Sequence, residues 1–441
     1  MSVESVLLDF RVLGCTDKAI YTRDVATVAT CVAEVLQQDC LEQGSISSAF
    51  SYSSIYSGPK DSMFTIKHYF REGLITLSIE YFKINSDDAL FLNYDSIENL
   101  EKLITKNLDA DSGSSIPPVK RCLLRCPYLR TSDDRIMEYR YDKLLFREQS
   151  PYQLVEIFST SDYGSMLVLD GYVNLADSDT VYTHNLMCKG SVDYKDKDVL
   201  ILGGGDGALL WELLQEENKP KFVTMVDIDE AVMRSCREFM PKVHGGILEN
   251  MEGDNYKIIV DDAFKWLKTY KDEGRKFDII FGDLTDIPVH EGGETWAFVK
   301  SILSQSLSIL TVGGRYQTHC NGINAGSALI LFENLVKGLD TPCTINQTSA
   351  YVPSFMETWV FYQLTKTGEG KDSEEKREEK LVEKKEEKKE DKKEEEKDGK
   401  KEEKKEEKKE EKKEEKKSPE KKGAKGLKES VEGEKKVKKG K

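Results

Sequence analysis

The chain has 441 residues and a formal net charge of −15, and its charged residues are unevenly distributed. Residues 369–441 hold 27 acidic and 30 basic side chains and contribute +3, so the rest of the chain carries −18. A field of this sign attracts cations and repels nucleic acid, although acidity also keeps proteins soluble. No run of about 18 apolar residues occurs, and no basic segment followed by an apolar one stands near the start. We therefore expect a soluble, cytoplasmic protein without a membrane partner.

The nine cysteines are scattered along the chain, and the closest pair with regular spacing is Cys122 and Cys126. No histidine cluster accompanies this pair, whereas zinc sites combine Cys and His at short fixed spacings. We expect reduced structural thiols and no metal site.

Residues 1–117 are predicted to form an independent α+β domain. Some runs alternate between apolar and polar residues as half-buried strands do, and others have helical spacing. The expected strands are 64–70 and 74–82, and the expected helices are 24–37 and 96–106. Residues 109–118 are rich in Gly, Ser and Pro, which is typical of a linker.

Residues 118–176 are predicted to form a small antiparallel β domain. Strand-like alternation recurs in three runs, and turns that contain glycine separate them. The runs are 139–146, 152–158 and 165–169, and the turns are 160–164 and 169–171.

From residue 177 to 367, strands and helices alternate, which indicates a Rossmann-like, doubly wound α/β domain. The expected strands are 199–203, 222–227, 256–260, 277–283 and 315–319, followed by 343–352 and 358–364. A dinucleotide enzyme would need a second mononucleotide-binding half and a separate substrate domain, and too little chain remains for both.

The strand at 199–203 leads into the turn Gly203-Gly-Gly-Asp-Gly207, after which a helix begins. Glycines let the backbone turn tightly and approach a ligand. An acid about 20 residues farther on, here Asp227, suits the hydroxyls of a ribose. We therefore expect Gly203 and Gly205 to contact an adenosine moiety, with NAD as a minority alternative.

Acidic residues stand at the ends of successive predicted strands. They are Asp206, Asp227, Asp229, Asp262 and Asp283. Because ligands of open α/β sheets bind beyond the carboxyl ends of the strands, these side chains should face one crevice. The crevice should be negative and its ligand positive. Asp262 is also placed to accept a hydrogen bond from an adenine amino group, and either Asp261 or Asp262 suits the N-cap of the next helix.

Residues 368–441 consist almost entirely of Lys and Glu in a period-four pattern. Like charges at i and i+4 disfavour an isolated helix, and the segment has too few apolar residues for a core. We expect a disordered tail that is a solvated spacer or that contacts a charged surface. Nucleic acid is an unlikely partner for the body, and for the tail the question stays open.

Five short motifs stand in the order and spacing of the aminopropyltransferases, the spermidine and spermine synthases. They are Tyr152-Gln153, Asp170-Gly171, Gly203-Gly-Gly-Asp-Gly207, Val226-Asp-Ile-Asp229 and Asp283-Leu-Thr-Asp286. Residues 120–364 resemble this family, and the combination is specific although no single motif is. The spermine-forming branch is the most similar, through 174–179, Tyr182-Thr183 and 352–362.

The resemblance implies an enzyme that transfers an aminopropyl group from decarboxylated S-adenosylmethionine to spermidine, producing spermine and 5'-methylthioadenosine. The donor is a co-substrate, so no cofactor is implied. An additional amino-terminal domain of about this length supports dimerisation in the family, which implies a homodimer.

The resemblance also implies roles for individual residues. Asp283 is the expected catalytic base, because a free amine with a pKa of about 10 is protonated at neutral pH and must lose a proton before it attacks. The expected polyamine-binding residues are Tyr182, Asp206, Asp283, Asp286 and Glu357. The expected donor-binding residues are Gln153, Gly203, Gly205, Asp227 and Asp262. The segment 287–294 has the glycines of a mobile lid.

Several alternatives stay open at this point. Asp286 is more typical of spermidine synthases, and Phe355 stands where spermine-forming relatives carry Tyr, so putrescine is the alternative acceptor. Asp227 is one methylene shorter than the Glu that is frequent in the family. Tyr182 also suits a core position, and Glu357 a solvated strand face. An S-adenosylmethionine-dependent methyltransferase would share the sheet but not the converging acids, and a non-catalytic interaction protein would act through the tail.

Overall fold

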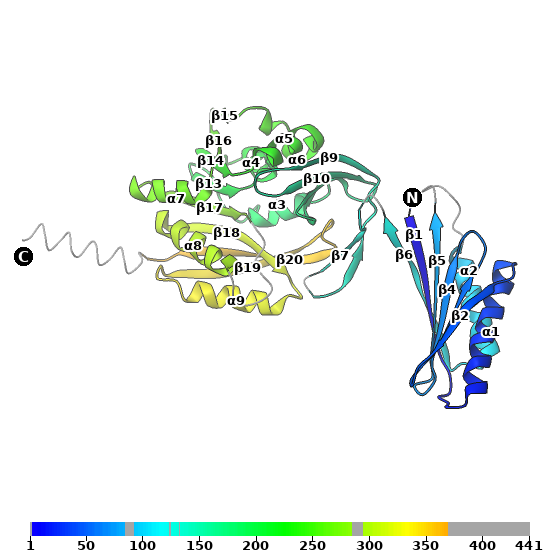
Figure 1. Ribbon diagram of the computed structural model, residues 1–441. Helices are drawn as coiled ribbons and strands as arrows, with labels where there is room; N and C mark the ends of the chain where they lie inside the picture. Colours follow the sequence, from blue (N-terminus) through cyan, green and yellow to red (C-terminus); the bar gives the residue numbers. More distant parts are fainter. Residues whose placement is uncertain (1, 84–91, 123–124, 132, 285–293, 369–441) are drawn as a thin grey trace, which may run out of the picture. The chain divides into compact units, whose positions relative to one another are not determined.

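The computed structural model describes residues 2–368 apart from 84–91, 123–124, 132 and 285–293 (Figure 1). The predictions for Asp286, for residues 287–293 of the expected lid at 287–294 and for the tail beyond residue 368 fall outside these residues. Across the described part of the chain, no helix combines the length and the apolar character needed to cross a membrane.

An antiparallel sheet of six strands lies in the amino-terminal part, in the order β2-β3-β4-β5-β1-β6. Its strands are β1 (Ser2–Arg11), β2 (Leu41–Ser47), β3 (Tyr52–Ser57), β4 (Met63–Tyr69), β5 (Leu74–Lys83) and β6 (Ser112–Cys122). Helices α1 (Lys18–Leu36) and α2 (Tyr94–Leu108) pack on one face of this sheet (Figure 1). Alternate residues of β5, namely Ile75, Leu77 and Ile79, are buried beneath them, as the period-two pattern predicts.

The linker predicted at 109–118 is wrong, because residues 112–122 form strand β6, which pairs with β1. Pro117 and Pro118 lie opposite a register shift between Ser5 and Leu7, and β6 is an edge strand. Proline lacks a backbone N–H, and an edge strand with a bulge tolerates that loss. The predicted domain limit at residue 117 therefore falls inside a strand.

Antiparallel strands continue the chain, as predicted. A two-stranded ribbon of β7 (Tyr128–Arg130) and β8 (Ile136–Glu138) precedes a four-stranded sheet in the order β12-β11-β10-β9. Its strands are β9 (Lys143–Gln149), β10 (Leu154–Thr160), β11 (Gly164–Leu169) and β12 (Tyr172–Ala176). Asp170 and Gly171 join β11 to β12 with φ values of 48° and 92°. Such a two-residue turn fits the twist of a hairpin, and Asp-Gly is a preferred sequence for it.

The third sheet confirms the Rossmann-like, doubly wound class. Its eight strands follow the order β15-β16-β14-β13-β17-β18-β20-β19, and the five from β16 to β18 are parallel. The strands are β13 (Asp198–Gly203), β14 (Phe222–Asp227), β15 (Glu252–Gly253), β16 (Tyr256–Val260), β17 (Phe277–Asp283), β18 (Leu310–Gly322), β19 (Cys343–Val352) and β20 (Glu357–Lys366). Strand β20 lies antiparallel between β18 and β19.

Helices cover both faces of this sheet. They are α3 (Thr180–Leu186), α4 (Ala208–Gln215), α5 (Glu230–Phe239), α6 (Pro241–His244), α7 (Ala263–Asp272), α8 (Glu294–Ile309) and α9 (Gly326–Lys337), with a short 3-10 turn at Ile247–Glu249. Val199 and Ile201 of β13 belong to the core on one face, and Leu200 and Leu202 belong to the core on the other. A strand buried on both faces explains why β13 is a continuous apolar run.

The order of the strands fixes where a ligand can bind. From β13 the chain moves outward to β14 and β16, and it then returns to the other side of β13 to form β17 and β18. The connections after β13 and β17 therefore diverge, which leaves a crevice at the carboxyl ends of these two strands.

Candidate active site

A cavity of about 320 Å³ opens at this switch point. The ends of the parallel strands contribute Gly203, Gly204, Gly205, Asp206, Asp227, Asp262 and Asp283 to its walls. The other side includes Gln153, Leu169, Asn174, Tyr182, His319 and Phe355. The cavity thus brings together eight of the ten residues that the sequence predicted for the site, and four of these eight are acids.

The glycine turn lets backbone lie directly against two of these acids. Gly203, Gly204 and Gly207 have φ values of +85°, +75° and +80°, where other residues are strained. A Cβ on Gly205 would lie 2.8 Å from the Asp227 carboxylate. The close approach allows the Gly205 N–H to donate to Asp227 Oδ2 at 2.9 Å.

Asp227 is held rigidly at the end of β14. Its second oxygen, Oδ1, accepts from the Asp229 N–H at 2.8 Å. Burial raises the pKa of Asp227 to about 6, and the negative charges of Asp206 and Asp229 act in the same direction, against the two amide hydrogen bonds. The carboxylate is therefore fixed in orientation, and its pKa lies close to neutral pH.

Asp206 lies in the turn between β13 and α4. Its Oδ1 accepts from the Ala208 N–H at 2.8 Å, and the residue is buried. This burial raises the pKa of its carboxyl group. A cation that enters the cavity would favour the charged form again, because opposite charges stabilise each other where water is excluded.

Tyr182 and Asp283 form a pair that the sequence did not predict. The Tyr182 hydroxyl, from α3, donates to Asp283 Oδ1 at 3.0 Å. The Tyr182 ring is buried and packs against His319, Phe355 and Phe361 at centroid distances of 5.8, 5.9 and 5.3 Å. Tyr182 is thus both a core aromatic and a wall of the cavity, and its hydroxyl orients the proposed base.

Asp262 is the predicted N-cap and also lies at the cavity. Its Oδ1 accepts from the Phe264 N–H at 2.8 Å as the N-cap of α7, and the residue also lines the cavity. Asp261 instead pairs with Lys265 on the surface.

Asp229 does not line the cavity, so its prediction as a crevice residue is wrong. It is the N-cap of α5, and its Oδ1 accepts from the Ala231 N–H at 3.0 Å. Its Oδ2 accepts from Ser150 Oγ at 2.7 Å and from Gln153 Nε2 at 3.0 Å. Asp229 therefore caps a helix and holds the cavity-lining Gln153 in place.

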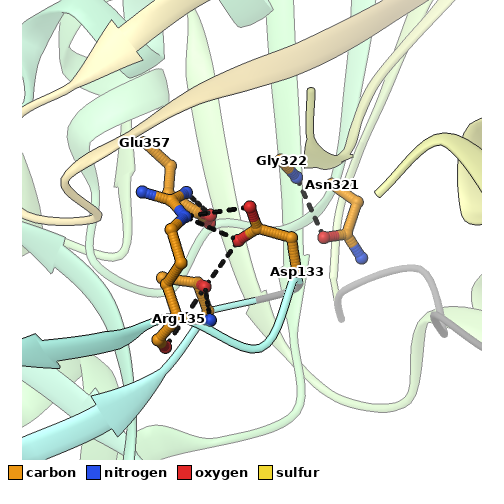
Figure 2. A network of polar contacts seen from close by, with 6 residues as sticks. Asp133, Arg135, Asn321, Gly322 and Glu357 are labelled. Carbon is orange, nitrogen blue, oxygen red and sulfur yellow. Dashed lines mark hydrogen bonds and ion pairs between the residues drawn. The ribbon is translucent and has the colours of Figure 1, made fainter. Parts of the chain in front are cut away.

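Glu357 is also not among the residues that line the cavity. It begins β20, its side chain is 6% exposed, and its Oε1 accepts from Arg135 Nη2 at 2.9 Å (Figure 2). The solvated strand face considered for Glu357 is therefore wrong. Arg135 was missed because it stands 222 residues away in a polar segment without periodicity.

The fold and the cavity define a class: a Rossmann-like α/β protein with an acidic cavity at the switch point of its sheet. Residues 179–375 match the spermine/spermidine synthase domain, and residues 128–177 match the spermidine synthase tetramerisation domain. Polyamine aminopropyltransferase 1 of Hyperthermus butylicus is 31% identical over 239 residues, which cover 52% of this chain and 78% of that protein. The chain belongs to the spermine and spermidine synthase family.

Two further relatives match with a lower identity or over a shorter overlap. The polyamine aminopropyltransferase of Aeropyrum pernix is 28% identical over 52% of this chain and 71% of that protein. The polyamine aminopropyltransferase of Pyrobaculum aerophilum is 36% identical over 32% of this chain and 47% of that protein. Among solved structures, spermidine synthase from Thermotoga maritima has a TM-score of 0.44 and 17% identity, covering 55% of this chain and 79% of that one.

Proposed function

We propose that this chain is an aminopropyltransferase that moves the aminopropyl group of decarboxylated S-adenosylmethionine to spermidine, producing spermine and 5'-methylthioadenosine. The observation that carries the proposal is Asp283, which lies in an acidic cavity beside the glycine turn and accepts a hydrogen bond from Tyr182. The membership of this chain in the spermine and spermidine synthase family supports the same reaction class.

Asp283 is proposed to act as the base in a single displacement. The acceptor amine loses a proton to the Asp283 carboxylate, its nitrogen bonds to the carbon next to the sulfonium, and the carbon–sulfur bond breaks. The sulfonium becomes a neutral thioether, so no anion develops that needs stabilisation. Because the sulfonium is already an activated leaving group, we propose that no further cofactor takes part.

The donor is proposed to bind between the glycine turn and the strand ends. Asp227 would accept from the ribose hydroxyls with a carboxylate that two backbone amides orient. Asp262 would accept from the adenine amino group, and Gln153, held by Asp229, would contact the nucleoside from the opposite wall. Gly203 and Gly205 would let the backbone approach it closely.

Charge balance favours spermidine as the acceptor. Spermidine keeps two ammonium groups beyond the attacking amine, and Asp206 and Glu357 would provide one carboxylate for each. The Arg135–Glu357 ion pair favours the second candidate, putrescine, because an occupied Glu357 leaves Asp206 for the single remaining ammonium.

A product assay with purified protein and decarboxylated S-adenosylmethionine distinguishes these candidates. We expect kcat/KM for spermidine to exceed that for putrescine by at least about tenfold, the value of one well-formed charged contact. Product identity would be read by chromatography after reaction with each amine alone and with both together. Equal or faster use of putrescine would overturn the spermine assignment but not the reaction class.

Methylthioadenosine binding is expected to weaken about tenfold between pH 7 and pH 5, because Asp227 titrates at about pH 6 and its protonated form accepts hydrogen bonds poorly. Its pKa in the folded state lies above its ordinary value, so the folded state takes up this proton more readily than the unfolded chain. The titration therefore weakens binding without itself destabilising the fold. Calorimetry across this range measures the effect. Asp227→Asn should bind weakly at every pH, and a flat profile in the wild type would contradict the ribose role.

The match of residues 128–177 to a tetramerisation domain supports an oligomer. The homodimer through the amino-terminal domain and the cytoplasmic location stay predictions.

A further inference from the structure

Three charged residues form a cluster at the start of β20, two residues after the cavity-lining Phe355. Arg135, just before β8, lies between Asp133 and Glu357 (Figure 2). Its Nε donates to both carboxylate oxygens of Asp133 at 2.9 Å, and its Nη2 donates to Glu357 Oε1 at 2.9 Å. Two carboxylates share one guanidinium, so the cluster has a net charge of −1 and attracts a second cation.

The two contacts of Arg135 use different nitrogen atoms of the guanidinium. The hydrogen bond to Glu357 can therefore break while the Nε–H still donates to Asp133. Thr131 fixes Asp133 in turn, because its hydroxyl donates to Asp133 Oδ1 at 2.6 Å and accepts from the Arg135 N–H at 2.9 Å. The Arg135 side chain is 47% exposed, so it has room to move toward solvent.

Glu357 itself is held in place relative to the cavity. It lies two residues after Phe355, which lines the cavity and meets the ring of Tyr182 edge-on. Just before Phe355, the backbone N–H and the hydroxyl of Ser354 donate to Asp179 at 3.0 and 2.5 Å. We therefore take the Glu357 carboxylate as the fixed partner and the Nη2 end of Arg135 as the partner with room to move away.

We propose that Arg135 is a specificity-determining residue. Its guanidinium acts as an internal cation that binds Glu357 until the distal ammonium of the acceptor replaces it there, and Arg135 then keeps only its bonds to Asp133. This inference rests on the proposed function. An acceptor with two ammonium groups beyond its attacking amine supplies one for Asp206 and one that competes for Glu357. A diamine supplies only the first and leaves the Arg135–Glu357 pair intact. Arg135 therefore weakens triamine binding and has no effect on diamine binding.

A purely structural role for Arg135 predicts the opposite outcome. If the ion pair only fastens the β7–β8 ribbon to β20, its loss would disorder Glu357 and weaken binding of the triamine. The sign of the change in spermidine affinity therefore separates the two roles.

The test compares wild type with Arg135→Gln by calorimetric titration of spermidine and of putrescine in the presence of methylthioadenosine. We expect the Kd for spermidine to fall about fivefold, the effect of a partly exposed ion pair, and the Kd for putrescine to stay unchanged. Arg140→Gln is the matched control, because Arg140 binds Asp162 at 2.6 and 3.1 Å on the exposed surface and should change neither value.

Two further variants test whether the change in spermidine affinity depends on Glu357. In a Glu357→Gln background, Arg135→Gln should leave the Kd for spermidine unchanged, because the carboxylate that both cations compete for is gone. Arg135→Lys keeps the charge but lacks the separate nitrogens that now bind Asp133 and Glu357, so its Kd for spermidine should lie between those of wild type and Arg135→Gln. It carries the test if the Gln variant does not fold.

An unchanged or higher Kd for spermidine in folded Arg135→Gln would overturn the proposal. So would an equal gain for putrescine, or a gain that persists without Glu357. Failure of the proposed function is read separately, from products formed by the wild type. A wild type that turns over putrescine faster, combined with tighter spermidine binding by Arg135→Gln, would refute the acceptor assignment and still support the role of Arg135.

Discussion

Asp283→Asn is expected to reduce turnover by about a thousandfold or more while leaving methylthioadenosine affinity within a few fold. A positioned general base contributes roughly 10²–10⁴ in rate, and an amide cannot take the proton of the acceptor amine. Asparagine has nearly the same shape, and its Oδ1 can still accept from the Tyr182 hydroxyl that now binds Asp283 at 3.0 Å. The loss should therefore appear in kcat and not in nucleoside binding.

Single-turnover rates at several pH values measure this effect. The variant should recover about tenfold in rate per pH unit toward pH 9, because the fraction of free amine in solution rises by that factor. Asp198→Asn is the matched control, since Asp198 lies at the opposite end of β13 and pairs with Lys221 at 3.0 Å. Full activity of Asp283→Asn would remove Asp283 from the base role.

The parallel strands were predictable because β13, β14 and β17 are buried on both faces and are therefore continuous apolar runs. The predicted limits of 222–227, 256–260 and 277–283 are those of β14, β16 and β17. Strand β18 extends beyond the predicted 315–319 to Leu310–Gly322. Leu310 pairs with Phe277 of β17 at one end, and Gly322 pairs with Trp359 of β20 at the other.

The amino-terminal part was less predictable because tertiary contacts override local composition there. The Gly, Ser and Pro content of residues 112–118 predicts a linker. In the structure, residues 112–122 pair with β1 and form an edge strand. Helix α1 begins at Lys18 and not at the predicted residue 24, because Asp17 caps it through the Ala19 N–H. A cap is easily missed where the following turn has no regular apolar spacing.

The candidate site was predicted where a local motif fixes the geometry. Asp206, Asp227, Asp262 and Asp283 each stand at the end of a parallel strand or shortly after it, and parallel strands end at the same edge. Arg135 has no such signal, since an ion pair across 222 residues depends on the folded arrangement alone. Asp229 shows a second limit of prediction from sequence, because an acid at a strand end can cap the next helix and not line the cavity.

Gly203→Ala is expected to destabilise the protein by at least ~3 kcal/mol and to abolish activity. Gly203 has a φ of +85°, and a Cβ at this position would lie 1.9 Å from the Asp283 carbonyl oxygen. The contact is with backbone, so no rotamer change relieves it. Gly203 and Asp283 are partners in the β13–β17 ladder. The steric clash can therefore be relieved only if the two strands separate at Asp283, the proposed base.

Urea unfolding and turnover measured on the same preparations distinguish strain from a purely local effect. Gly326→Ala is the matched control, because nothing lies within 4 Å of its Cβ at the start of α9, and alanine there should be neutral or stabilising by up to ~1 kcal/mol. If Gly203→Ala unfolded at the wild-type urea concentration, the close approach of β13 to the Asp283 backbone would be wrong. If it were folded and fully active, the glycine turn would not be what positions the base against the donor.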